Sequence, residues 1–158
     1  AGDQAQFSRP FGVCVTDAGV VVVADTANHR IRDGNVSTLA GNGTKGYQDG
    51  DGVGTMFNHP LGVVMDGEGN VLVADTDNHR IRKISADGRV TTLAGNGVGG
   101  HRDGDGTQAQ FNQPIGLCVD SEGVMYVADS NNHRIRRITR DGHVSTVAGN
   151  GQGGHQDG

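Results

Sequence analysis

Tryptophan is absent from this 158-residue chain, and aromatic residues make up only 4% of it. No apolar run approaches the roughly 20 residues that a membrane-spanning helix needs, which excludes a helical transmembrane protein. The first residues, AGDQAQFSRP, lack the apolar segment of a secretory signal, so we expect no such signal. The sequence therefore leaves the cellular compartment open.

Glycine, in contrast, is abundant, with 28 residues. Each glycine costs a helix about 1 kcal/mol relative to alanine, so coiled coils and helix bundles are disfavoured. Valine, isoleucine and leucine occur in clusters rather than diluted along the chain, which argues against disorder. The formal net charge of −5 gives no general attraction to nucleic acid or to an anionic membrane.

Three copies of one unit make up the chain. The sequence Val-Ala-Asp, followed closely by Asn-His-Arg-Ile-Arg, begins at Val23, Val73 and Val127. The turn Ala-Gly-Asn-Gly recurs in step, and residues 57–104 match residues 111–158 at 29 of 48 positions. A period of about 50 residues is typical of architectures built from stacked repeats.

Each unit predicts four short antiparallel strands joined by glycine-rich turns. In the first unit they are expected at Gly12–Thr16, at Val20–Ala24, from Arg30 onward, and at Val36–Ala40. The first strands are apolar at nearly every position, as expected for strands covered on both faces. Four residues are missing from the last hairpin of the first unit. The fold class is therefore all-β, with β-propeller blades at about 11–40, 61–94 and 115–148.

The residues of these units resemble the NHL repeat family over essentially the whole chain. The shared motif is Pro-x-Gly-Val, a turn, and then Val-Ala-Asp and Asn-His. The residue after Asn-His is Arg30, Arg80 or Arg134, where the family name has leucine. The resemblance implies a six-bladed disc that serves mostly as a binding platform. It also implies that some members bind RNA and that a minority are metal-dependent lyases.

Three blades do not close a propeller, because a ring typically needs about four to eight. Linkers of 20 residues are expected at 41–60, at 95–114 and, split between the two ends, at 149–158 plus 1–10. Residues 155–158 followed by 1–7 also align in sequence with residues 101–111. We therefore expect a head-to-tail homodimer with six blades, in which the partner is a second copy of this chain. The sequence begins and ends within a linker, at matching points of the repeat. This pattern also suggests a piece of a longer repeat protein or a designed half-propeller.

Polar residues repeat in every unit around the turn between the second and third strands. They are Asp25, His29, Arg30, Asp75, His79, Arg80, Asp129, His133 and Arg134. Such residues could serve an enzyme as acid–base pairs or metal ligands. Catalysis, however, needs one asymmetric constellation rather than the same residues in every blade. We interpret them as a structural network, and we predict no catalytic residue, no metal site and no cofactor.

Two charged patterns raise alternatives to this interpretation. Eight of the 13 basic residues lie in third strands and could form a groove for RNA. The net acidity and the scarcity of aromatic stacking groups argue against nucleic acid as a partner. The runs Asp-Gly-Asp-Gly at 49–52 and 103–106 are similar to a calcium loop, but they lack the further oxygen ligands and terminal glutamate of an EF-hand.

The two cysteines occupy equivalent positions in the first and third units. Val64 fills the same place in the second unit, so Cys14 and Cys118 are predicted to be small apolar core residues. Because they belong to different blades, we expect no disulfide between them, and a reducing compartment suits them.

Ligand specificity can be encoded in the linkers, because their sequences vary between otherwise similar units. Linkers of 20 residues are also long for a compact protein, which marks them as functional or surface-forming segments. The candidate binding residues are Lys45, Tyr47, His101, Arg102, His155 and Gln156. The central channel, lined by the first strands, is the other candidate pocket.

The function expected from the sequence is that of a non-enzymatic scaffold or binding module, which self-assembles into a six-bladed ring. Its further partner is an unidentified protein or small ligand, and no membrane is involved. One alternative is a metal-dependent lyase, which predicts bound zinc and loss of activity on chelation. The other is an RNA-binding NHL domain, which predicts binding that weakens steeply with salt.

Overall fold

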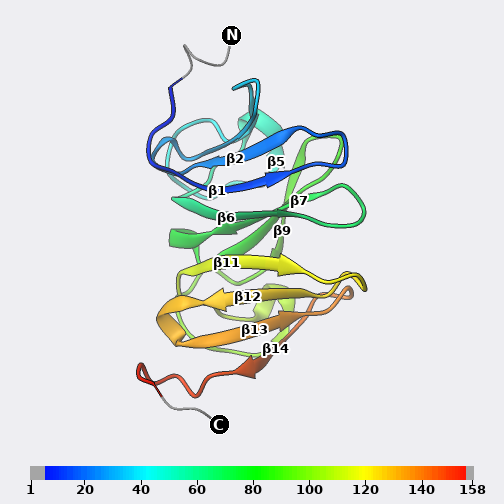
Figure 1. Ribbon diagram of the computed structural model, residues 1–158. Coiled ribbons are helices and arrows are strands. Elements are labelled where there is room, and N and C mark those ends of the chain that lie inside the picture. Colours follow the sequence, from blue (N-terminus) through cyan, green and yellow to red (C-terminus); the bar gives the residue numbers. More distant parts are fainter. Residues whose placement is uncertain (1–5, 156–158) are drawn as a thin grey trace.

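Three antiparallel β-sheets stand side by side in the computed structural model, which describes residues 6–155 (Figure 1). Blade 1 consists of β1 (Pro10–Val15), β2 (Val21–Asp25), β3 (Arg30–Asp33) and β4 (Thr38–Ala40). Blade 2 contains β6 (Pro60–Met65), β7 (Val71–Asp75), β8 (Arg80–Ile84) and β9 (Arg89–Ala94). Blade 3 contains β11 (Pro114–Val119), β12 (Met125–Asp129), β13 (Arg134–Ile138) and β14 (His143–Ala148). Consecutive strands pair within each blade, so the predicted all-β chain of three antiparallel blades is confirmed.

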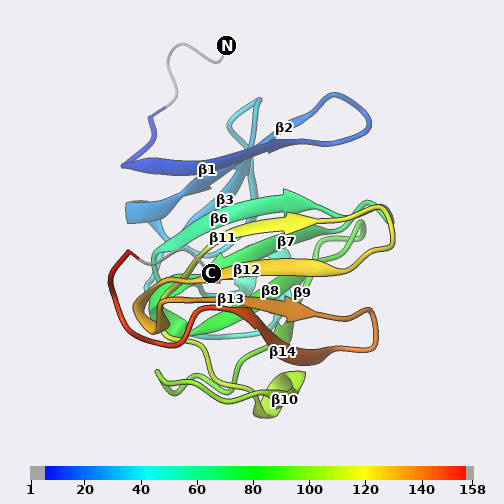
Figure 2. The same ribbon diagram turned by 60° about the horizontal axis from the view of Figure 1, so that its bottom comes forward.

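Two of the sheets gain a fifth strand that the sequence analysis did not predict. β5 (Gly50–Asp51) pairs with β9 in blade 2, and β10 (Gly104–Asp105) pairs with β14 in blade 3. Each is followed by one turn of 3-10 helix, η3 (Gly52–Gly54) or η5 (Gly106–Gln108). Figure 2 shows β10 at the outer edge of blade 3, beyond β14. A linker therefore crosses to the outside of the next blade before it reaches that blade's first strand.

A single turn of 3-10 helix also links the second and third strands of every blade. These turns are η2 (Thr26–Asn28), η4 (Thr76–Asn78) and η6 (Ser130–Asn132). Each ends at a histidine in the left-handed region, with φ of 54° at His29, 54° at His79 and 51° at His133. This region is uncommon outside glycine, but histidine enters it more readily than most residues. Within residues 6–155, no helix has the length and hydrophobicity that crossing a membrane requires.

The first strands β1, β6 and β11 run side by side along the inner edge of the stack (Figure 1). They approach so closely that glycine is required. A Cβ on Gly12 would lie 2.2 Å from the carbonyl oxygen of Leu61, and one on Gly62 would lie 2.0 Å from that of Ile115. The expectation that first strands are covered on both faces is wrong, since β1 and β11 are largely exposed or half-buried. Every residue of β7 is buried instead, because blade 2 packs against blade 1 on one side and blade 3 on the other.

The core lies between the blades rather than inside any one of them. One buried cluster joins blades 1 and 2 and includes Ile31, Ala40 and Phe57. The second cluster joins blades 2 and 3 and includes Ile81 and Phe111. Burying one large apolar side chain contributes about 1.5–3 kcal/mol, so these two seams account for much of the stability of the array.

The outward faces of blades 1 and 3 lack such a neighbour. Val13 is 63% exposed and Ile135 is 41% exposed, whereas their counterparts in blade 2, Val63 and Ile81, are 8% and 0% exposed. Cys14 packs half-buried against the first cluster, and burial raises the pKa of its thiol. The equivalent Cys118 is exposed on blade 3, so its predicted place in the core is wrong. The three-blade array therefore presents two apolar end faces.

The hairpin that lacks four residues shortens the outer part of blade 1. Its predicted fourth strand, Val36–Ala40, is reduced to Thr38–Ala40. Val36 itself lies in the turn with φ of 67°, an unusual conformation for a β-branched residue. Blade 1 thus differs from blades 2 and 3 at its outer edge.

Candidate functional site

Each blade is held together by a buried aspartate at the end of its second strand. The carboxylate of Asp75 accepts hydrogen bonds from the backbone N–H of Asn58 and from Nδ2 of Asn78, both at 2.8 Å. Nη1 of Arg82 donates to it at 2.6 Å, and both side chains are fully buried. Burial raises the pKa of the Asp75 carboxyl, and the Arg82 charge and the N–H donors oppose that rise. The same pattern of contacts recurs at Asp25 and Asp129.

A linker carboxylate completes the arginine network in blades 2 and 3. Nη2 of Arg82 lies 2.6 Å from Oδ1 of Asp49, and Nη2 of Arg136 lies 2.7 Å from Oδ1 of Asp103. Burial acts to raise the pKa of Asp103, but the hydrogen bond and charge of Arg136 outweigh it, and the pKa lies below its ordinary value. The linker aspartates thus bind arginine. Within residues 6–155, no three His, Cys, Asp or Glu side chains gather as a metal site requires.

The repeated histidines and arginines make contacts between chain segments. Nδ1 of His29 accepts the backbone N–H of His59 at 3.1 Å, and Nδ1 of His79 accepts that of Gln113 at the same distance. Burial lowers the pKa of His29, and electrostatic interactions with His59 and Lys45 lower it further. The repeated arginines hold the Gly-Asn-Gly turns, with Nη2 3.0 Å from a carbonyl oxygen in the pairs Arg30–Asn42, Arg80–Asn96 and Arg134–Asn150.

The linker residues proposed as ligand contacts lie against the next blade. The hydroxyl of Tyr47 lies 2.9 Å from Oγ1 of Thr92, and the Arg80 guanidinium stacks 3.7 Å from its ring centre. Nε2 of His101 lies 2.9 Å from Oγ1 of Thr146. Lys45 and Arg102 form single β-bridges with Phe57 and Gln110. His155 is the last residue that the structure describes, and Gln156 lies outside the described residues.

A cavity of about 500 Å³, here called the axial cavity, opens where the inner strands begin, beside η2 and η4. Its wall contains positions that differ between the three units inside otherwise constant motifs. The residues before the prolines are Arg9, His59 and Gln113, those after them are Phe11, Leu61 and Ile115, and the turns add Ala27 and Asp77. The blades therefore present different chemistry to one shared space.

A chain of hydrogen bonds fixes the polar side of the axial cavity. Nδ1 of His59 lies 2.6 Å from Oδ2 of Asp77, and Nε2 of Gln113 donates to Oδ1 of Asp77 at 3.3 Å. Nδ2 of Asn131 in turn donates to Oε1 of Gln113 at 2.8 Å. Because Asp77 engages Nδ1, Nε2 is the imidazole nitrogen of His59 that remains for a ligand. Orienting a histidine through its other nitrogen in this way suits recognition of a polar group.

Arg9, His59, Asp77 and Gln113 are not among the residues predicted from the sequence, although the central channel is a predicted candidate pocket. From the sequence alone, specificity is expected in the linkers because those segments vary most in composition. A signal was present in the motifs themselves, since the residue before each proline and the second residue of each 3-10 turn vary between units. Single positions that vary within otherwise constant motifs therefore point to this cavity more directly than the variable linkers do.

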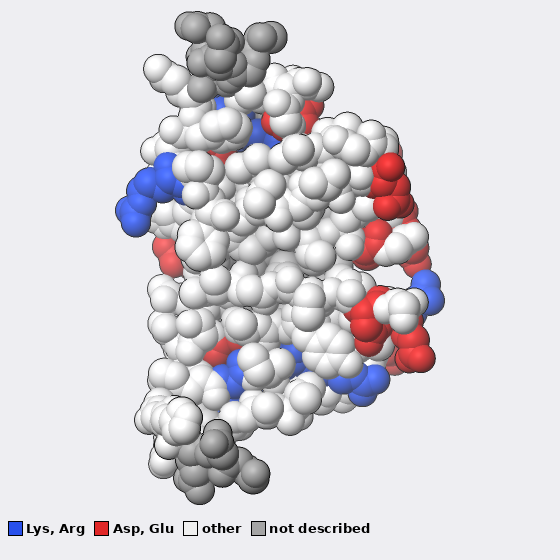
Figure 3. Space-filling view, viewed as in Figure 1, with Lys and Arg blue, Asp and Glu red and all other residues white. Residues whose placement is uncertain are grey.

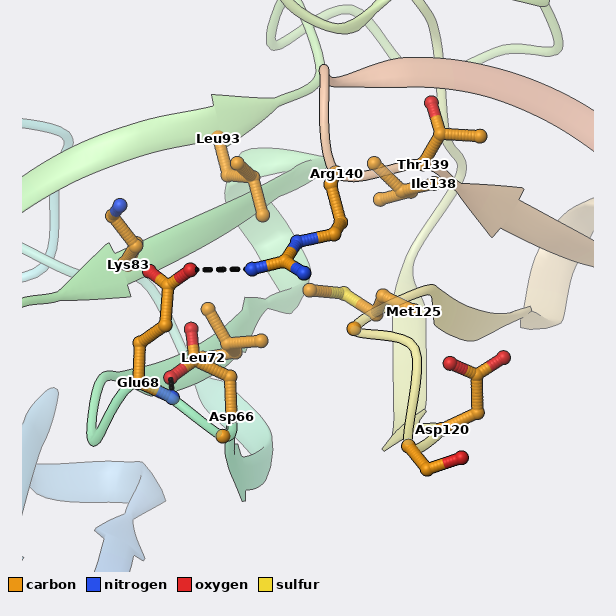
Figure 4. Close-up of a pocket in the computed structure, with 13 residues that line it drawn as sticks. Asp66, Glu68, Leu72, Lys83, Leu93, Asp120, Met125, Ile138, Thr139 and Arg140 are labelled. Carbon is orange, nitrogen blue, oxygen red and sulfur yellow. Dashed lines mark hydrogen bonds and ion pairs between the residues drawn. The ribbon is translucent and has the colours of Figure 1, made fainter.

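A second cavity of about 310 Å³ lies between blades 2 and 3 (Figure 4). Its floor is apolar and contains Leu72, Met125 and Ile138. Across it, Nη2 of Arg140 lies 2.8 Å from Oε1 of Glu68, in an exposed pair of the kind that contributes little stability. Asp66 and Asp120 at its rim accept backbone N–H groups of their own turns. Acidic side chains also gather on this side of the molecule, away from the axial cavity (Figure 3, right).

The pattern that defines the NHL repeat matches residues 7–32, 57–84 and 111–138, which is more than half of the chain. The chain belongs to the NHL repeat family. This NHL chain is 36% identical over 152 residues to NHL repeat-containing protein 2 from Bos taurus, covering 84% of the chain and 21% of that protein. It is 48% identical over 50 residues to Protein SUPPRESSOR OF QUENCHING 1, chloroplastic, from Arabidopsis thaliana, covering 32% of the chain and 5% of that protein. The chain thus spans about a fifth or less of these two relatives.

Solved structures similar to this NHL chain are six-bladed β-propellers, of which it covers only part. A structural genomics protein of unknown function from Bacteroides thetaiotaomicron has a TM-score of 0.76 and 27% identity, with 81% of this chain and 34% of that chain covered. An auxiliary nutrient binding protein from the same organism has a TM-score of 0.73 and 28% identity, with 86% and 37% covered. Virginiamycin B lyase from Staphylococcus aureus shares the fold alone, with a TM-score of 0.59, 17% identity, and 89% and 41% covered.

Proposed function

We propose that this chain is a non-enzymatic binding module that holds a small ligand in the axial cavity, and that two copies close a six-bladed ring around it. The observation that carries the binding role is the convergence of variable repeat positions on one cavity. Arg9, His59, Gln113 and Asp77 give a shared space four different polar groups, whereas the buried aspartates are the same in every blade. The structural relative called an auxiliary nutrient binding protein supports a ligand-binding role.

Polar contacts that repeat at both internal seams support closure by a second copy. Each seam has the histidine-to-backbone bond described above and one more bond from a turn threonine. Oγ1 of Thr26 donates to the carbonyl oxygen of Pro60 at 2.7 Å, and Oγ1 of Thr76 donates to that of Pro114 at 2.8 Å. The next members of both series are His133 and Ser130 on blade 3. In a head-to-tail dimer they would face the N–H of Arg9 and the carbonyl oxygen of Pro10 of the other copy. A head-to-tail second copy would repeat both bonds.

The apolar end faces support the same closure. A Cβ on Gly116 would meet only the Cβ of Ala128, at 3.5 Å, whereas Gly12 and Gly62 face the backbone of the next blade. In a closed ring, Gly116 would face the carbonyl oxygen of Phe11 of another copy. Ile135 and its neighbours would lose their exposure there, and apolar burial contributes about 25 cal/mol per Å². Two identical head-to-tail seams make a closed dimer with twofold symmetry.

Light scattering on the 158-residue chain tests the assembly. We expect a particle of twice the 16.4 kDa of one chain. Gly116→Ala is expected to give a folded monomer, because the added methyl group has room within one chain but would strike the backbone of another. Gly67→Ala is the matched control, since nothing lies within 4 Å of its added Cβ, and it should remain a dimer. A wild-type monomer at micromolar concentration would overturn the ring.

Ligand-observed NMR with a mixture of monosaccharides, amino acids and small carboxylic acids tests the binding role. We expect bound components to be released in Leu61→Trp, which fills the axial cavity. They should be retained in Val98→Trp, which lies on an exposed linker. Absence of any bound component would overturn the binding role, as would turnover of a component upon addition of zinc.

A further inference from the structure

Among residues 6–155, Arg9 is the one lysine or arginine that lines the axial cavity. Within the described part of the chain, its guanidinium forms neither an ion pair nor a hydrogen bond. Asp77 is the one carboxylate that residues 6–155 contribute to the wall, and it is already bound by His59 at 2.6 Å and by Gln113 at 3.3 Å. The Arg9 guanidinium therefore lines the cavity without a carboxylate of the described residues paired to it, because Asp77 is bound by other side chains.

The remainder of the wall is largely apolar. Phe11, Leu61 and Ile115 follow the three prolines and line the same space as Arg9. Phe11 is exposed, and Leu61 and Ile115 are half-buried, so their side chains have apolar surface left to cover. A ligand that fits this wall combines an anionic end with an apolar body.

The symmetry of the proposed ring adds a second constraint. Six positions around an axis would follow the order Arg9, His59, Gln113, and then the same three residues of the second copy. A twofold rotation places each residue opposite its own copy, so the two Arg9 side chains would face each other across the axis. Two like charges around one cavity repel, and a ligand with two anionic ends would relieve that repulsion.

We propose that the axial cavity binds an α,ω-dicarboxylate, one molecule per two chains, with each carboxylate held by one Arg9. The guanidinium is a planar donor that engages carboxylates in paired hydrogen bonds. The methylene groups between the carboxylates would lie on Phe11, Leu61 and Ile115. This inference rests on the ring proposed above.

Isothermal titration calorimetry with glutarate, adipate and pimelate tests it, with hexanoate as the single-carboxylate control. We expect one dicarboxylate per two chains, and at least about tenfold weaker binding of hexanoate. Arg9→Gln should weaken dicarboxylate binding by about tenfold or more while the dimer persists. Glutamine suits the backbone there, because Gln113 occupies the equivalent position with the same φ of 51°. Arg89→Gln, the same change at the exposed first residue of β9, is the control and should bind as the wild type does.

The outcomes separate this inference from the proposed function. A dimer that binds none of the dicarboxylates, binds one per chain, or binds them equally well as Arg9→Gln would overturn the dicarboxylate proposal and leave the ring intact. Bound sugars or amino acids in the NMR mixture would then still support a binding module. A monomeric wild type, in contrast, would overturn the ring itself.

Discussion

The guanidinium of Arg82 lies 2.6 Å from the carboxylate of Asp49, 33 residues earlier in the chain. Asp49 belongs to the linker that leaves blade 1, and Arg82 lies in β8, so the pair ties each linker to the blade it approaches. The next blade repeats the pair at 2.7 Å. In blade 1, Nη2 of Arg32 donates instead to the carbonyl oxygen of Val36 in the shortened hairpin. The buried Nε atoms of Arg32 and Arg136 both lack a hydrogen-bond partner within residues 6–155.

Replacing the linker carboxylate should weaken the fold. Asp49→Asn removes the charge that faces the fully buried Arg82, and we expect a loss of about 1–3 kcal/mol in the free energy of unfolding. Urea denaturation measures it. Asp17→Asn, in the exposed turn after β1, is the matched control and should leave the midpoint unchanged. Equal midpoints for Asp49→Asn and the wild type would contradict the structural role of the pair.

Acid should remove part of the stability through Asp103. Its folded pKa lies below the ordinary value of 3.8, so the folded chain keeps this carboxylate ionised to lower pH than the unfolded chain does. The stabilisation is therefore present above 3.8 and is lost as the pH falls through the lower folded pKa. Urea unfolding measured from about pH 5 to about pH 2 should show a shallower decline for Asp103→Asn than for the wild type. Parallel curves would contradict this.

A second pH dependence should arise from His29. Its pKa is lowered, mainly by burial, so the folded chain resists the proton that the unfolded chain takes up near 6.5. The contribution of His29 to the free energy of unfolding is therefore fully present above pH 6.5 and declines as the pH falls below that value. His29→Asn should flatten the decline, because asparagine tolerates the left-handed backbone and does not titrate. His143→Asn, at the exposed first residue of β14, should retain the wild-type slope, and an unchanged slope in His29→Asn would exclude this source.

The inner strands should tolerate no side chain at Gly62. An added Cβ would lie 2.0 Å from the carbonyl oxygen of Ile115, so β6 and β11 must move apart. We expect Gly62→Ala to lower the free energy of unfolding by about 1–3 kcal/mol or more, as overpacking does. Gly67→Ala, with open space around its added Cβ, should stay close to the wild type in the same thermal or urea melt. Similar losses for both variants would argue against close strand approach as the cause.

The repeat and its blades could be predicted from the sequence because the constant residues recur at fixed spacing. Strands of four to six residues, such as β8 and β14, also carry a visible apolar pattern. β5 and β10 could not be predicted, because each has two residues in a glycine-rich linker and no periodicity. Their pairing depends on a blade that comes later in the chain.

The site was harder to predict for a different physical reason. The axial cavity takes single residues from three blades, and His59, Asp77 and Gln113 meet only when the blades pack. Tyr47 and His101 stood out in the sequence as aromatic or titratable residues in variable segments. The fold uses both of them to contact a threonine of the next blade. A distinctive side chain in a linker is therefore a weak guide to ligand contact in this repeat.

The fifth strands, β5 and β10, make the order of the blades directional. Each linker is donated forward, so a blade receives its outermost strand from the blade before it and supplies one to the blade after it. The two end faces of the array are consequently different. Two identical end faces cannot pair through a donated linker strand. In any larger assembly built from these contacts, all blades therefore follow one another in the same direction. Removing one blade and its linker would also remove the outermost strand of the blade that follows.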